Sequence, residues 1–137
     1  MIDKFENEYA FLSNFYDSPI TIGDITYPTV EHYFQAMKTM DIDARREIAA
    51  AATPGQAKRM GRSVNLRPDW EAVKFDIMRA GLVAKFSIPE LREKLLATGE
   101  ERLVEGNWWG DRFWGQCKGK GLNMLGLLLM EIRTTLK

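Results

Sequence analysis

The amino-acid sequence predicts one α+β domain over residues 1–137, predominantly α-helical with a small β-hairpin or sheet. Three observations support this fold class. The chain has 137 residues, a length that favours one domain and is sufficient for a hydrophobic core. Apolar residues recur at helical spacing between capping residues along most of the chain. Only one short stretch alternates apolar and polar residues around a turn, as a hairpin does.

The hairpin is expected first, followed by a helix. Residues 20–22 and 25–27 alternate apolar and polar side chains around Gly23 and Asp24, a dipeptide typical of tight turns. Thr29 can cap a helix that continues to about residue 40.

The later elements follow from similar start and stop signals. Thr53, Pro54 and Gln56 mark one helix start, and Ser87 with Glu90 forms the capping-box pattern of another. The remaining helices are expected at about 43–52, 54–61, 68–86, 88–98 and 122–136; residues 102–105 are compatible with a strand and 106–121 form a loop rich in glycine and tryptophan. Gly126 lies inside the last helix, where glycine is unfavourable, so we expect another segment to pack closely there.

Composition excludes several classes of protein. Lys+Arg and Asp+Glu each total 19, so general coating of nucleic acid is not expected, because that binding neutralises phosphates. Cys117 is the only cysteine and His32 the only histidine, which excludes an intramolecular disulfide and a Cys/His zinc site. The charged first residues do not resemble a signal peptide, and the apolar run 127–130 is too short to span a membrane. We expect a cytoplasmic protein without a metal or other cofactor.

The helix after Thr29 has a polar stripe of Glu31, Gln35 and Lys38 beside its apolar face. It is either a solvated face or the wall of a pocket that carries an acid and an amine. Helical spacing alone does not separate these interpretations.

The loop after residue 106 concentrates aromatic residues without helical or strand periodicity. Trp108, Trp109, Phe113 and Trp114 lie within seven residues, beside Asp111. They either plug the core or hold a flat ring next to a carboxylate, and we favour the ring.

Two basic clusters could bind phosphate. Lys118 and Lys120 precede the expected start of the last helix, where backbone N–H groups favour an anion; residues 58–62 form the second cluster. The alternatives are a solvated turn and a charged helix end. His32 is interpreted as a hydrogen-bonded structural residue, and a Cys117–His32 nucleophile pair has no local support.

Several motifs in family order carry a resemblance to the NADAR superfamily, also called YbiA-like proteins. They are FLSNF (11–15), YPTVEHYFQAMK (27–38), AKRMGR (57–62), LRPDW (66–70), DRFWG (111–115) and GLNMLGLLLMEIR (121–133). The resemblance implies a mainly helical fold with a small β element and N-glycosidase-type activity. It implies two substrate classes: ribosylamino pyrimidine phosphates of riboflavin synthesis, and ADP-ribose attached to guanine in DNA. The implied partner is thus a nucleotide-like small molecule or ADP-ribosylated nucleic acid.

The resemblance also extends to individual residues. Glu31 and Asp111 match the family's acidic residues, Lys38 matches the lysine that closes the first motif, and Trp114 with the Asn14–Phe15 pair matches pocket positions. This chain departs from many relatives at 107–110 (NWWG), which leaves base selectivity open. The candidate catalytic residues are Glu31, Asp111 and Lys38, and the candidate substrate-binding residues are Asn14, Phe15, Gln35, Lys58, Arg62, Trp108, Trp114, Gly115, Lys118, Lys120 and Asn123.

The expected reaction is hydrolysis of the ribose C1–N bond of a phosphorylated ribosyl compound. Either Asp111 or Glu31 would orient water and stabilise positive charge at C1. Alternatively, Lys38 would attack the ring-opened sugar as a neutral amine and form a Schiff base. The competing hypothesis is a module that binds ADP-ribose or a nucleotide without cleaving it.

Overall fold

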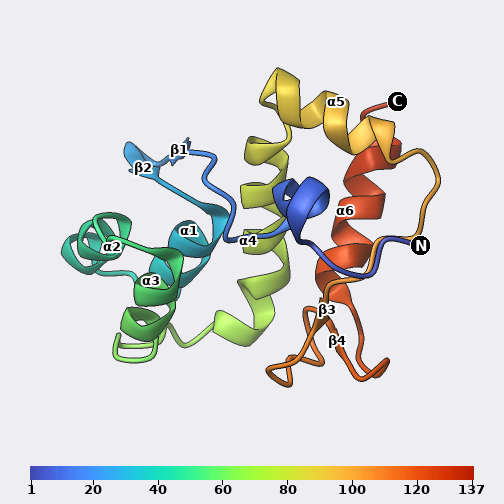
Figure 1. The fold of residues 1–137 in the computed structure, drawn as a ribbon. Helices are drawn as coiled ribbons and strands as arrows, with labels where there is room; N and C mark the ends of the chain where they lie inside the picture. The colour runs from blue at the N-terminus through green and yellow to red at the C-terminus, as the bar shows by residue number, and fades with distance from the viewer. The chain divides into compact units, whose positions relative to one another are not determined.

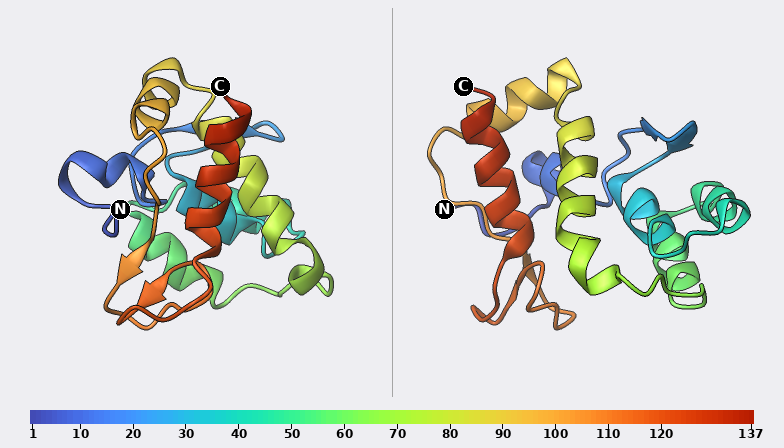
Figure 2. Two further views of the ribbon diagram at one scale, coloured as in Figure 1. Left: turned by 90° about the vertical axis from the view of Figure 1, so that its right-hand side faces the viewer. Right: turned by 180° about the vertical axis from the view of Figure 1, so that it is seen from behind.

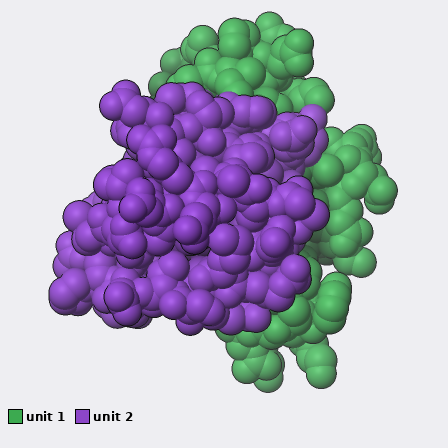
Figure 3. All heavy atoms as spheres, turned by 90° about the vertical axis from the view of Figure 1, so that its left-hand side faces the viewer, with its two compact units in different colours: residues 1–13, 86–137 green, residues 14–85 purple.

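Helices dominate the structure, a computed structural model that describes residues 1–137 (Figures 1 and 2). This confirms the predicted helical α+β class. The chain forms two compact units, residues 14–85 and residues 1–13 with 86–137, which are coloured separately in Figure 3. We call them the central unit and the terminal unit. The single domain over 1–137 stays a prediction. None of the helices combines the length and apolar character needed to cross a membrane.

In the central unit the hairpin forms as predicted. Strands β1 (Ile20–Ile22) and β2 (Ile25–Tyr27) pair antiparallel, with Ile20 opposite Tyr27. The turn residues Gly23 and Asp24 have φ of 59° and 66°. Two consecutive positive φ angles match the right-handed twist of the strands, which explains why glycine and aspartate occupy the turn.

Helix α1 (Val30–Ala36) starts as predicted but ends before residue 40. Thr29 caps it, because its hydroxyl oxygen accepts a hydrogen bond from the His32 amide at 3.1 Å. At the other end, Arg67 donates from its backbone N to the Lys38 carbonyl at 2.8 Å and from its guanidinium to the Met37 carbonyl at 3.4 Å. These carbonyls are therefore satisfied from a distant segment, and the chain leaves the helix.

The helix α1 packs against the three other helices of its unit, α2 (Ile42–Ala49), α3 (Pro54–Gly61) and α4 (Trp70–Lys85). Gly81 allows α4 to approach, since a Cβ there would lie 2.7 Å from the Tyr33 ring. Burial raises the pKa of Tyr33 to about 12. At the end of α4, Lys85 is fully buried, its Nζ lies 5.6 Å from the Tyr16 ring centroid, and burial lowers its pKa to about 7.

The start of α3 confirms the capping prediction. The Thr53 hydroxyl oxygen accepts from the Gln56 amide at 3.0 Å, and the Gln56 side chain accepts from the Ala52 amide at 2.9 Å. Pro54 takes the first helical position and Gly61 the last. Reciprocal bonds of this kind satisfy amides that a helix start leaves unpaired.

The terminal unit contains a 3-10 helix, η1 (Asn7–Leu12), and the helices α5 (Pro89–Ala97) and α6 (Met124–Thr135). The predicted helix start at Ser87 is one residue too early, because Ile88 is the N-cap and Pro89 takes the first helical position. Gly99, with φ of 64°, follows the helix end as expected. The buried Arg133 of α6 donates to the Thr98 hydroxyl at 2.9 Å and to the Glu101 carbonyl at 2.8 Å.

Residues 102–105 do not form the expected strand. Leu103 makes one isolated bridge with Ile2, and the parallel ladder is β3 (Gly106–Asn107) with β4 (Gln116–Cys117). The Asn123 side chain hydrogen-bonds to backbone groups of this segment that a strand would pair. Its Nδ2 donates to the Leu103 carbonyl at 2.9 Å, and its Oδ1 accepts from the Glu105 backbone N–H at 2.9 Å. The close packing expected at Gly126 is confirmed, since a Cβ there would collide with the Leu103 carbonyl.

Candidate functional site

The polar stripe of α1 is buried, so its interpretation as a solvated face is wrong. Glu31 and Gln35 are 8% and 4% exposed. The Gln35 amide Nε2 donates to Glu31 Oε2 at 2.6 Å. The Glu31 backbone N donates to the Asn14 carbonyl at 3.1 Å, which brings Asn14 to the start of α1. A buried carboxylate with a hydrogen-bond donor can remain ionised and oriented.

Lys38 lies just beyond the end of α1, partly buried and near charged side chains of both signs. Burial lowers the pKa of Lys38, Glu31 opposes this shift, and the cations Arg62 and Lys58 lower it further. Its Nζ lies 5.9 Å from the ring centroid of Trp70, which packs on Phe34 at 5.0 Å. A lowered pKa increases the neutral fraction of the amine, which is the form that attacks carbon.

Two buried acceptor atoms in this unit have no partner in the protein, Asn14 Oδ1 and Gln35 Oε1. The amide of Asn14 donates instead to the Met78 sulfur at 3.5 Å. Buried polar atoms are nearly always hydrogen-bonded, so each exception requires an explanation. Both exceptions belong to residues that the sequence selected as binding residues.

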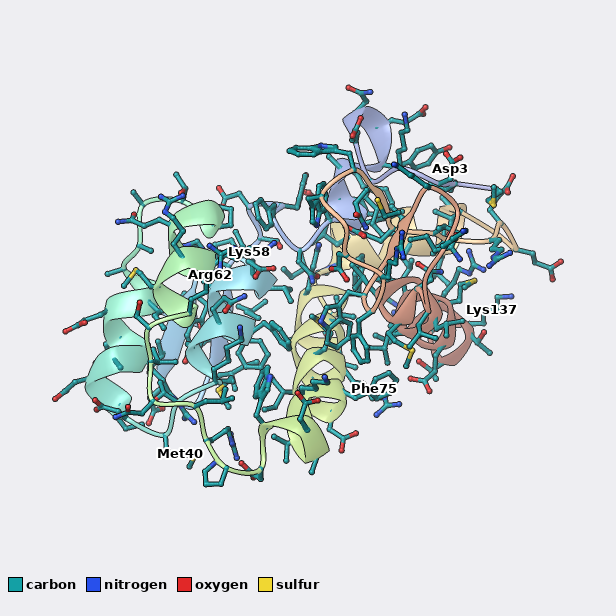
Figure 4. The ribbon with its side chains drawn as sticks, turned by 90° about the horizontal axis from the view of Figure 1, so that it is seen from below. Asp3, Met40, Lys58, Arg62, Phe75 and Lys137 are labelled. Carbon is teal, nitrogen blue, oxygen red and sulfur yellow. The ribbon has the colours of Figure 1, made fainter.

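The basic residues of α3 lie beside the same cluster. Lys58 and Arg62 are four residues apart, and Figure 4 shows their side chains close together. Both act electrostatically on Lys38. Phe15, next to Asn14, is 46% exposed and presents an aromatic surface.

His32 has the structural function that was expected. Its Nε2 lies 3.0 Å from the Ala51 carbonyl and its Nδ1 lies 2.8 Å from the Thr29 hydroxyl. A carbonyl only accepts, so Nε2 donates, and both ring nitrogens are occupied.

In the terminal unit, Asp111 organises the aromatic loop. Its Oδ1 accepts from the amides of Phe113 at 3.0 Å and Trp114 at 2.9 Å. The Asn107 side chain accepts from the Asp111 amide at 3.1 Å and donates to the Asp111 carbonyl at 2.9 Å. One Asp111 oxygen thus holds the loop, and Oδ2 accepts no hydrogen bond from the protein.

Gly115 and Asn123 hold this loop from its other end. The Gly115 carbonyl accepts from the Asn123 amide at 3.2 Å, and a Cβ at Gly115 would collide with the Glu105 carboxylate. Asn123 is 2% exposed and both ends of its side chain bond to the backbone. The side-chain amide of Asn123 is therefore fully used in holding the backbone, and we assign Asn123 a structural role instead of the expected contact with substrate.

The backbone N–H groups expected to bind phosphate at the start of the last helix are already paired. Three backbone N–H groups at this helix start donate to backbone carbonyls of the preceding loop: Asn123 to Gly115, Met124 to Phe113, and Leu125 to Trp114. They are therefore not available to an anion. Lys118 and Lys120 instead belong to a tight turn in which Cys117 and Lys120 exchange backbone hydrogen bonds. Only their side-chain ammonium groups are left for an anion.

Trp108 lines a surface groove of the terminal unit of about 380 Å³. Lys4, Gln116 and Lys118 line the same groove. Trp108 is 85% exposed, and Trp109 packs against it edge to face with ring centroids 5.7 Å apart. Asp3 and Glu6 line it as well, so the two lysines are balanced by two carboxylates. The exposed ring of Trp108 fits a flat group.

The fourteen candidate residues thus form two groups. The central unit contains Asn14, Phe15, Glu31, Gln35, Lys38, Lys58 and Arg62, and the terminal unit contains Trp108, Asp111, Trp114, Gly115, Lys118, Lys120 and Asn123. Sequence reasoning did not select Gly61, Trp70, Glu105 and Asn107. Of these four residues, Gly61 and Trp70 lie within the family motifs, so the sequence could have identified these two as candidates.

Comparison with known proteins defines the class of enzyme. The chain is 48% identical over 134 residues to N-glycosidase YbiA of Escherichia coli K12, covering 95% of this chain and 83% of that protein. It is 44% identical over 136 residues to N-glycosidase Npun_R5314 of Nostoc punctiforme, covering 94% and 86%. The chain is an N-glycosyl hydrolase.

The family follows from a match along almost the whole sequence. The profile of the NADAR domain matches residues 2–137, and the chain belongs to the NADAR family. The NMR structure of E. coli YbiA has the same fold, with a TM-score of 0.85 and 46% identity over 99% of this chain and 86% of that one. The chain is also 40% identical over 145 residues to the maize riboflavin biosynthesis protein PYRR, chloroplastic, covering 92% of this chain and 23% of that protein.

Proposed function

We propose that this enzyme hydrolyses the ribose C1–N bond of a phosphorylated ribosyl compound at the Glu31–Lys38 cluster. The supporting observation is the environment of Lys38. This amine has a lowered pKa beside the carboxylate of Glu31, with Lys58 and Arg62 as neighbouring cations. An acid, an amine and anion-binding side chains are the groups that cleavage of a phosphorylated N-glycoside needs.

Two substrates fit this chemistry. One is a ribosylamino pyrimidine phosphate, which the name of the maize relative favours. The other is ADP-ribose attached to guanine in DNA, which the family resemblance implies. Both have a flat base, a ribose and phosphate, so Lys58 and Arg62 would bind phosphate in either.

In the first route, Glu31 activates water directly. The C1–N bond breaks, positive charge develops at C1, and the Glu31 carboxylate stabilises that charge. Water adds to C1 while its proton passes to Glu31, and the departing nitrogen takes up a proton. The products are the free pyrimidine and the ribose phosphate for the first substrate, and unmodified guanine in the DNA with ADP-ribose for the second.

In the second route, Lys38 forms a covalent intermediate. The ribose ring opens to give an imine between C1 and the substrate nitrogen, and the neutral Lys38 amine adds to C1. The substrate amine then leaves with the proton that Lys38 gives up, and a Lys38 Schiff base remains. Water hydrolyses this Schiff base to the sugar aldehyde and the free lysine.

The terminal unit has a candidate binding surface of its own. There Trp108, rather than Trp109, is the candidate contact for a flat group, because Trp108 lines the groove together with Asp3, Lys4, Glu6 and Lys118. Asp111 Oδ2 remains a candidate carboxylate, and Trp114 a candidate ring contact.

The test is a mass-spectrometric release assay in EDTA. A guanine-ADP-ribosylated DNA oligonucleotide and the ribosylamino pyrimidine phosphate are offered separately to wild type, Glu31→Gln and Lys38→Met. We expect either loss of ADP-ribose from the DNA or release of the pyrimidine, and a loss of activity of at least about a thousandfold in both variants. Binding of both substrates without turnover by folded wild-type protein would instead indicate a module that binds and does not cleave.

Trapping and pH separate the two routes. Borohydride during turnover reduces a Schiff base, so the second route predicts a covalent adduct on Lys38. It also predicts a kcat that rises with pH through the pKa of Lys38, because deprotonation produces the attacking amine. No adduct and a rate that falls over that pH range would assign Lys38 to anion binding and leave the first route.

A further inference from the structure

Gln35, Glu31 and Gly61 form a contact series that connects α1 with the end of α3. The Gln35 Nε2 donates to Glu31 Oε2 at 2.6 Å, a short hydrogen bond between the two buried side chains. On its other side the Gln35 amide lies against Gly61. A Cβ at Gly61 would collide with Gln35 Oε1 and lie 2.9 Å from its Cδ and 3.1 Å from its Cβ.

The orientation of the Gln35 amide carries the inference. In the observed orientation Nε2 meets Glu31, and Oε1 is buried without a partner. Leaving the buried Oε1 acceptor unpaired costs free energy. The hydrogen bond from Nε2 to Glu31 must therefore offset that cost. The opposite orientation would direct a carbonyl oxygen at a carboxylate. The amide therefore takes the orientation that supplies a donor to the Glu31 oxygen, at the cost of leaving its own oxygen unpaired.

We propose that Gln35 is a positioning residue that keeps Glu31 ionised and fixed in direction, and that Gly61 provides the space this amide needs. The proposal rests on the proposed function in giving Glu31 a chemical role. It goes beyond that function by assigning a task to Gln35 that involves no contact with substrate. It also explains why α3 ends on a residue without a side chain at this point.

The test measures Glu31 directly and needs no substrate. Proteins labelled with ¹³C at the glutamate carboxyl are titrated by NMR, and the signal missing from Glu31→Gln identifies Glu31. In Gln35→Leu we expect the titration midpoint of Glu31 to move to higher pH by about one unit, because the donor to the charged form is lost. In Gln35→Glu it moves further, since two carboxyl groups at hydrogen-bond distance do not both ionise readily.

Helix α3 supplies a matched pair of glycines for the second arm. Gly61→Ala pushes on the Gln35 amide and should move the midpoint in the same direction as Gln35→Leu. Gly55→Ala is the control, because a Cβ there meets only Thr53 Oγ1 at 3.9 Å and Arg59 Nη1 at 4.0 Å. We expect Gly55→Ala to leave the midpoint unchanged. An unchanged midpoint in folded Gln35→Leu or, if that variant does not fold, in Gly61→Ala overturns the proposal.

Kinetics then connect the positioning to catalysis. In Gln35→Leu the acid limb of the kcat/KM profile should move by the same amount as the NMR midpoint, with activity recovering at higher pH. A purely structural effect would lower activity equally at every pH. If Glu31→Gln keeps full activity, the proposed role of Glu31 fails, whereas the NMR result still decides what Gln35 does.

Discussion

The two polar clusters differ in how their side chains use their hydrogen bonds. In the central unit, Gln35 donates to Glu31 from one turn further along α1, and Lys38 lies just beyond the helix. In the terminal unit, Asn107, Asp111 and Asn123 bond mainly to backbone groups of their own loop. A helix satisfies its backbone internally, whereas an irregular loop needs side chains to do so. Carboxylate and amide side chains are therefore available for chemistry in the first cluster, whereas in the second they mainly stabilise the loop backbone.

This difference ranks the two acidic candidates. Glu31 accepts a hydrogen bond from the Gln35 side chain, whereas one oxygen of Asp111 accepts from the backbone amides of Phe113 and Trp114. Substitutions that separate stability from activity test this difference between the two acidic residues.

The largest effect on stability is expected at Gly126. Gly126→Ala places a methyl group against the Leu103 carbonyl and 2.6 Å from Asn123 Oδ1, and the backbone there cannot yield without disturbing the loop. We expect a loss of about 3 kcal/mol, at the upper end of overpacking costs. Urea unfolding measures it, with Gly61→Ala as the comparison. Equal losses in the two variants would contradict the distinction between the units.

A smaller effect is expected at Asp111. Asp111→Ala removes the acceptor of two loop amides and should cost about 1–2 kcal/mol, the usual cost of losing a capping side chain. Asp111→Asn keeps an oxygen acceptor and should stay within about 0.5 kcal/mol of wild type. Thermal unfolding measures stability, and the release assay measures activity. A stable Asp111→Asn protein with activity reduced more than tenfold would make Asp111 catalytic as well as structural.

The smallest effect on stability is expected at Trp108. Its side chain is 85% exposed, so Trp108→Ala should change the free energy of unfolding by less than about 0.5 kcal/mol. If the ring contacts the ligand, KM should rise several-fold while kcat changes little. Trp109→Ala is the matched variant. A larger rise in KM for Trp109→Ala would exchange the roles assigned to the two rings.

Two predictions that rest on local signals succeeded. The hairpin around Gly23 and the start of α3 at Thr53 depend on neighbouring residues, and both formed as predicted. The burial of the α1 stripe and the early end of α1 depend on Arg67 and on packing from other elements, which spacing along one helix cannot show.

The candidate site was predictable only where its residues lie in sequence motifs. Family motifs selected Glu31, Gln35 and Lys38, and the structure brings the three together. The roles of Asn107 and Asn123 could not be derived, because they depend on the path of a loop without periodicity. Position 61 was visible as a glycine, but its contact with Gln35 depends on tertiary packing.

The burial of Lys85 also has a consequence for proton binding. Its pKa is about 7 in the folded protein and about 10.4 in an unfolded chain. Between these values the unfolded state binds a proton that the folded state lacks, so this residue makes unfolding more favourable at low pH. Its contribution to the free energy of unfolding should rise from pH 7 towards pH 10, and unfolding at about pH 9 should take up close to one proton that Lys85→Met does not take up. Folding of the end of α4 is thus coupled to loss of the Lys85 proton, and it becomes more favourable as the pH rises.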